Sequence, residues 1–145
     1  MESRIEKAAE FFGKGFNCAQ SVVAVFCEKY NMNIDTALKL SGGMGGGFRS
    51  GEICGAVSGA VIVIGLKYGQ DSTGSATEKQ ECNKKTIEFI KRFKEQNKYI
   101  VCKEILGHNV AIKKEYEQAL NKNLFKTTCV DMVKSAVAIL EELEY

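Results

Sequence analysis

Four of the six cysteines in this 145-residue sequence lie at positions that favour a reactive or metal-binding sulfur. Each falls at or near the predicted start of a helix, and the four are Cys18, Cys54, Cys102 and Cys129. A helix start offers unpaired N–H groups and the positive end of the helix dipole, which favour a thiolate over a thiol. We therefore expect lowered pKa values, which would make these side chains nucleophiles or metal ligands at neutral pH.

The spacing of the cysteines in the sequence does not show which of them lie together in the folded protein. No two are separated as in a C-x-x-C motif, so neither a thioredoxin-type motif nor a zinc ribbon is present locally. Cys27 follows Cys18 by nine residues, which places the two on opposite faces of one straight helix. Cys82 lies in a charged segment without an obvious partner, and we assign neither Cys27 nor Cys82 a role. Each cysteine could also be a small hydrophobic core residue.

A glycine-rich segment, residues 42–51 (GGMGGGFRSG), precedes Cys54. So many glycines indicate positive φ angles or a close approach of the backbone to another group. The segment lacks the lysine of a P-loop and the spacing of G-x-G-x-x-G, which argues against a nucleotide site. We expect it to pass close to Cys54, where Arg49 could favour a thiolate or an anionic ligand. Gly47, Arg49 and Gly55 are the candidate binding residues. The alternative is a tight turn, with close helix packing at Gly55 and Gly59.

Composition excludes several functions. Twenty basic and 18 acidic residues give a net charge of +2, without the basic patch of a nucleic-acid-binding protein. The apolar segment 56–66 is too short to span a membrane and is expected to be a buried helix. The amino terminus does not resemble a signal peptide, so we expect a cytoplasmic protein with reduced thiols. His108, the single histidine, is expected at a helix end, with a metal-ligand or general-base role as the alternative.

The elements that must position the cysteines are predicted to be helices. The sequence favours one all-α domain over residues 1–145, a bundle of about six to seven helices with a glycine-rich loop before the central apolar helix. Asn17 is predicted to cap a helix, and Gly107 to end one. Helical periodicity is found over residues 5–12, 18–30, 35–40, 53–68, 76–97, 101–106, 111–120 and 129–143.

The segment Cys54-Gly55-Ala56-Val57-Ser58-Gly59 matches a known pattern. Together with Cys18, Cys102 and Cys129 it resembles the C_GCAxxG_C_C family, which is described as redox-active. The resemblance covers nearly the whole chain and implies redox chemistry on these four cysteines, whereas Cys27 and Cys82 lie outside the pattern. Similar segments accompany haem-binding proteins of the split-Soret cytochrome type. This sequence has no C-x-x-C-H site, so covalent haem is not expected here.

Three hypotheses follow for the function. In the first, the four cysteines converge and cycle between dithiol and disulfide, as in a thiol–disulfide oxidoreductase, with Cys54 as the more reactive thiol. In the second, Cys18, Cys54, Cys102 and Cys129 bind zinc or an iron–sulfur cluster. In the third, the chain is a helical interaction protein with passive cysteines. A redox partner protein and a homo-oligomer are compatible with the sequence, whereas nucleic acid and membrane insertion are not expected.

Overall fold

The apolar segment 56–66 forms part of helix α4 (Gly55–Tyr68), which has seven buried residues. Five of its side chains are almost fully buried, namely Ala56, Val57, Ala60, Val63 and Ile64. The helix packs against α2 (Cys18–Ala24), α5 (Ala76–Asn97) and α8 (Thr128–Glu142). The β-branched run at residues 61–64 is therefore helical, as its small flanking residues predict.

The computed structural model describes residues 3–145, and in this range the chain is all-α, which confirms the expected fold class. It has eight α-helices where about six to seven were expected, because short segments also form separate helices. The remaining elements are α1 (Arg4–Gly13), η1 (Cys27–Tyr30), α3 (Ile34–Leu40), η2 (Gly47–Gly51), α6 (Cys102–Leu106) and α7 (Lys113–Asn121).

Several helix boundaries follow from local signals in the sequence. The Asn17 side chain accepts a hydrogen bond from the Gln20 N–H, and the Gln20 side chain accepts one from the Asn17 N–H, which forms a capping box at the start of α2. Gly107 adopts the left-handed conformation after α6, as predicted. The predicted helix 18–30 is interrupted, however, since α2 ends at Ala24 and a short 3-10 turn follows.

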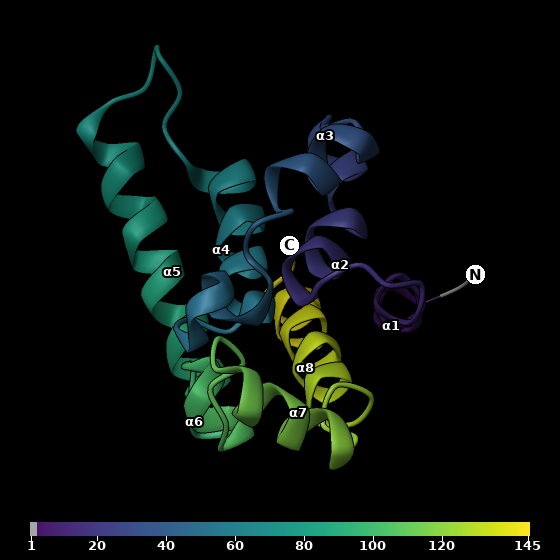
Figure 1. Ribbon diagram of the computed structural model, residues 1–145. Coiled ribbons are helices and arrows are strands. Elements are labelled where there is room, and N and C mark those ends of the chain that lie inside the picture. The colour runs from purple at the N-terminus through teal and green to yellow at the C-terminus, as the bar shows by residue number, and fades with distance from the viewer. Residues whose placement is uncertain (1–2) are drawn as a thin grey trace.

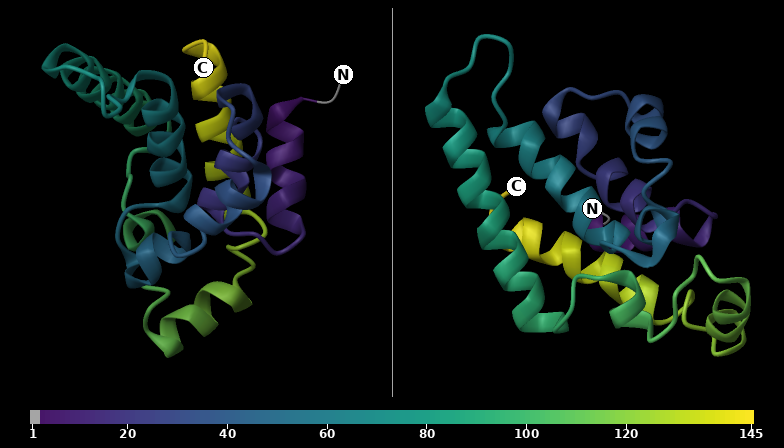
Figure 2. Two further views of the ribbon diagram at one scale, coloured as in Figure 1. Left: turned by 90° about the horizontal axis from the view of Figure 1, so that it is seen from above. Right: turned by 60° about the vertical axis from the view of Figure 1, so that its left-hand side comes forward.

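The helices form one bundle. The main core joins α1, α2, α4, α5 and α8, with Phe26, Phe89 and Phe93 among its largest buried side chains. In Figure 1, α6 and α7 (green) lie at the end of the bundle opposite α3, and Figure 2 shows the same arrangement from two further directions. Among residues 3–145, no helix has the length and apolar character needed to cross a bilayer.

Candidate thiol site

Cys18, Cys54, Cys102 and Cys129 all line one cavity of about 400 Å³. Cys18 is the first residue of α2, Cys54 precedes α4, Cys102 begins α6 and Cys129 is the second residue of α8. Cys18 and Cys54 belong to the main core, whereas Cys102 and Cys129 belong to a smaller apolar cluster beneath α6. The cavity therefore lies where the two clusters meet, and helices distant in the sequence contribute the four sulfur atoms.

Backbone pairing joins the segments that carry Cys54 and Cys102. Ile53 and Val101 form an isolated antiparallel bridge, and the Cys54 N–H donates to the carbonyl of Ile100 at 2.8 Å. The Cys102 N–H donates in turn to the carbonyl of Glu52. Side chains alternate between two faces along paired extended segments. Cys54 follows Ile53 and Cys102 follows Val101, so both point to the face opposite that of the bridging side chains. Cys54 and Cys102 accordingly share the face that borders the cavity.

Two glycines allow α4 to approach the start of α2. A Cβ built on Gly55 would lie 2.9 Å from the Cβ of Cys18, and one built on Gly59 would lie 2.8 Å from the carbonyl oxygen of Ala19. Real Cβ atoms essentially never come within 3.0 Å of another heavy atom, so any larger residue would push the helices apart. Close helix packing at Gly55 and Gly59 thus brings Cys18 next to Cys54.

Cys18 and Cys129 line the same cavity, and the pKa of each depends on the other. A side-chain hydrogen bond to Cys129 raises the pKa of Cys18 well above its ordinary value, and burial and the three neighbouring thiols raise it further. The same hydrogen bond from Cys18 lowers the pKa of Cys129, although burial opposes this. Of the two thiols, Cys129 has the lower pKa. Cys129 is therefore the thiol that ionises first.

The other two thiols stay protonated. Burial raises the pKa of Cys54 to about 11, although the backbone N–H groups of Ala56 and Val57 act in the opposite direction. Burial also raises the pKa of Cys102 to about 12, and the nearby Cys54 and Cys129 add to the increase.

Of the four lowered pKa values that the helix starts predict, only that of Cys129 is found. The prediction is wrong for Cys18, Cys54 and Cys102, because loss of hydration and thiol neighbours outweigh the helix N-terminus. These pKa values also favour Cys129 over Cys54 as the more reactive thiol. The guanidinium of Arg49 lowers the pKa of Cys102, not that of Cys54, and only as a minor contribution.

The glycine-rich segment makes a left-handed turn beside the cavity. Four consecutive residues, Gly46 to Arg49, have φ angles between 54° and 61°. At Gly47 a Cβ would lie 2.4 Å from the backbone nitrogen of Glu52, so only glycine fits. Phe48 and Arg49 adopt the same conformation at a cost of about 1–2 kcal/mol each.

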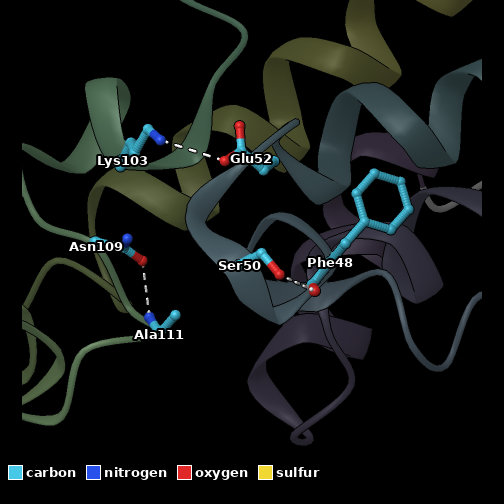
Figure 3. A network of polar contacts seen from close by, with 6 residues as sticks. All are labelled: Phe48, Ser50, Glu52, Lys103, Asn109 and Ala111. Atoms are coloured by element: carbon cyan, nitrogen blue, oxygen red, sulfur yellow. Dashed lines mark hydrogen bonds and ion pairs between the residues drawn. The ribbon is translucent and has the colours of Figure 1, made fainter.

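Figure 3 shows the surroundings of this turn. The Ser50 hydroxyl donates to the carbonyl of Phe48 at 3.0 Å, and the Phe48 ring points away from the other labelled side chains. Lys103 of α6 pairs with Glu52 at 3.2 Å, which ties α6 to the end of the turn. The turn and α6 are therefore linked on the outer side of the cavity.

Apolar side chains supply most of the remaining lining, and sequence reasoning did not assign them to a site. Their only signal in the sequence is helical periodicity, which does not distinguish a cavity wall from a core. Among residues 3–145, Arg49 is the one charged residue in the lining, and Gly47 and Gly55 also border the cavity. The apolar residues are Phe12, Phe16, Ile105, Leu106, Val110, Leu120, Phe125 and Met132.

The remaining candidates lie elsewhere. Cys27 is buried in a separate cluster with Val23 and Ala37, and Cys82 packs at the edge of the main core. His108 lies outside the cavity lining, with its Nε2 atom 3.1 Å from the Nζ atom of Lys122. Within residues 3–145, no three histidine, cysteine or acidic side chains are placed to hold one metal ion.

The fold and the site define an all-α protein with four cysteines around an apolar cavity. The chain belongs to the family described as "Putative redox-active protein (C_GCAxxG_C_C)", whose family model matches residues 16–143. The match includes all four cysteines of the cavity and the CGAxxG segment that begins α4. Comparison with curated proteins and with solved structures gave no match.

Proposed function

We propose that this protein carries out dithiol–disulfide exchange at the cavity, with Cys129 as the attacking thiol and Cys18 as the resolving thiol. The observation that carries the proposal is the shared cavity of Cys18 and Cys129, and the lowered pKa of Cys129 beside the raised pKa of Cys18 supports it. Such a pair supplies a thiol that ionises more readily than an ordinary cysteine beside a second sulfur that can complete a disulfide. The family description as redox-active supports the same chemistry.

The exchange reduces a disulfide substrate in two steps. The Cys129 thiolate attacks one sulfur of the substrate, forms a mixed disulfide and releases the other sulfur as a thiolate. Cys18 then gives up its proton to that leaving thiolate and attacks the sulfur of Cys129, which releases the second substrate sulfur as a thiolate that takes a proton from water. The substrate gains two electrons and becomes two thiols, and Cys18 and Cys129 become a disulfide. A dithiol reductant, either a partner protein or a small molecule, restores the starting state.

Cys54 and Cys102 form a second pair in this proposal. They share one face of the backbone bridge and are buried, so they remain protonated while Cys129 reacts. Their place in the same cavity allows a disulfide formed at Cys18 and Cys129 to pass to them by further exchange. We place this chemistry in the cytoplasm, where a reducing pool keeps such thiols available.

The proposal is tested by oxidising the reduced protein with one equivalent of a small disulfide and mapping the new bond by mass spectrometry. We expect a Cys18–Cys129 disulfide in the wild type, and a trapped mixed disulfide on Cys129 in the Cys18→Ser variant. The Cys129→Ser variant should lose the fast reaction, whereas the Cys27→Ser and Cys82→Ser controls should keep it. Unchanged fast reaction in Cys129→Ser would contradict the proposal.

Metal binding is a second use of the same four side chains, favoured by their common cavity. A tetrahedral zinc site needs all four sulfurs about 2.3 Å from one point, and the described residues are not arranged in this way. Metal analysis of protein purified without oxygen separates the two functions. One equivalent of zinc or iron that is lost in Cys18→Ser, Cys54→Ser, Cys102→Ser and Cys129→Ser would favour the metal centre over the exchange proposed here.

A further inference from the structure

The cavity has a shape and a charge that point to one class of substrate. Its volume of about 400 Å³ falls in the range of small-molecule sites and is too small to enclose a folded partner. Phe12, Leu106, Phe125 and Met132 contribute to walls that are predominantly apolar. A molecule that reaches the sulfur atoms must therefore bring an apolar body into contact with these walls.

The opening of the cavity is identified by lining residues that are also exposed. Tyr116 and Leu120 of α7 line the cavity with 37% and 53% of their surfaces accessible. Arg49 of the left-handed turn also lines it and is exposed. The entrance thus combines apolar groups with a single positive charge.

The guanidinium of Arg49 is held against the cavity wall. A Cβ built on Gly46 would lie 2.7 Å from its Nη1 atom, so the side chain folds back over the backbone of Gly46, which is itself part of the lining. No acidic side chain within residues 3–145 forms an ion pair with Arg49, whereas the neighbouring Lys103 is paired with Glu52. A planar guanidinium without a carboxylate partner is suited to bind an anionic group.

From this arrangement we infer that the substrate is a small disulfide with an apolar body and an anionic group, whose negative charge binds Arg49 while its disulfide reaches Cys129. This inference rests on the proposed function and adds the substrate class to it. The bonds that form and break are those of the exchange described above. Arg49 is a binding residue, and it neither gives nor takes a proton.

Two aromatic disulfides of different charge test the inference: dithiobis-nitrobenzoate, which is anionic, and dithiodipyridine, which is neutral. Both release a coloured thiol, so stopped-flow absorbance gives the rate constant with the reduced protein. Each rate is divided by that of the same disulfide with the unfolded protein to remove differences in intrinsic reactivity. The hydrophilic cationic disulfide cystamine is a third probe and should react most slowly on this scale.

We expect Arg49→Gln to slow the reaction with the anionic probe about five-fold and to leave that with the neutral probe nearly unchanged. Lys126→Gln, which removes a cation outside the cavity lining, is the matched control and should change neither rate. Added salt should slow the anionic probe selectively in the wild type, which tests the charge without any substitution.

The outcomes separate the two ideas. If Cys129→Ser reacts as fast as the wild type, the proposed function fails, and the inference that depends on it fails as well. If Cys129→Ser is slow but Arg49→Gln and salt affect both aromatic probes equally, the substrate class is wrong and the exchange at Cys129 stands. Faster normalised reaction with cystamine than with either aromatic probe would likewise overturn the inference.

Discussion

Gly55 lies directly against Cys18 where α4 meets the start of α2. The missing side chain of Gly55 leaves room for the Cβ of Cys18, which a Cβ at residue 55 would approach to 2.9 Å. Gly55, the first glycine of the CGAxxG segment, thus leaves room for a cysteine from another part of the chain. Its effect on the site is through packing and needs no contact with a ligand.

Replacing Gly55 by alanine should destabilise the protein by about 1–3 kcal/mol, because the added methyl group has no space between α2 and α4. The reaction of Cys129 with small disulfides should also slow, since Cys18 is displaced. Urea denaturation and stopped-flow kinetics measure the two effects. Gly65→Ala is the matched control, because Gly65 is in the same helix and nothing lies within 4 Å of an added Cβ. It should stabilise the protein by up to about 1 kcal/mol.

Removing the hydrogen-bond donor of Cys18 should raise the pKa of Cys129. In Cys18→Ala the thiolate of Cys129 loses the interaction that lowers its pKa, so its reaction with iodoacetamide should begin at higher pH. At neutral pH the alkylation rate should fall about tenfold for each unit by which the pKa rises. Mass spectrometry of the Cys129 peptide over a pH series measures this. Cys27→Ala should leave the profile unchanged, and a Cys129 profile that is the same in Cys18→Ala would show that the pair does not interact.

Alkaline pH should destabilise the fold through Cys54. Its pKa is raised to about 11 in the folded protein, so the unfolded chain loses this proton first, near its ordinary pKa. The stabilisation is complete below that value and is lost as the pH rises through about 11, an effect of about 2–3 kcal/mol. Urea denaturation between neutral and alkaline pH should show the decline. In Cys54→Ala the decline should be smaller, and an equal decline in both proteins would argue against a protonated Cys54.

Glycine at position 48 should stabilise the left-handed turn. Phe48 has a φ of 59° and is 46% exposed, so its replacement removes backbone strain and little packing. We expect Phe48→Gly to raise the free energy of unfolding by about 1 kcal/mol. Ser50→Gly is the control in the same turn, at a residue without a positive φ, and should destabilise by about 0.5–1 kcal/mol. Both values come from urea denaturation at neutral pH.

Features of the fold that depend on nearby residues could be predicted from the sequence. The helix over residues 76–97 has the predicted bounds, and the Asn17 cap and the Gly107 helix end are as expected. Apolar periodicity and capping residues act within a few turns, so a single sequence contains the information. The early end of α2 is different. Val22, Val23 and Val25 are β-branched and weaken a helix, but the periodicity alone does not show where it ends.

The sequence predicts which cysteines line the cavity, but it does not predict the order of their pKa values. Helix starts and the CGAxxG segment identified the four cysteines that share the cavity. The order of their pKa values depends on how deeply each sulfur is buried and which thiol lies beside it, and both depend on tertiary packing. For the same reason the sequence indicated Cys54 as the reactive thiol, whereas the lowered pKa of Cys129 supports the role proposed for it here.

The pairing of Ile53 with Val101 limits how the cavity can open. The start of α4 and the start of α6 are joined through main-chain hydrogen bonds on both sides of that pair, so these two helix ends must move together. Side chains at positions 53 and 101 can vary without breaking the link, because the backbone provides it. A bulky molecule therefore has to move other segments of the lining, such as α7, and the distance between Cys54 and Cys102 would not change.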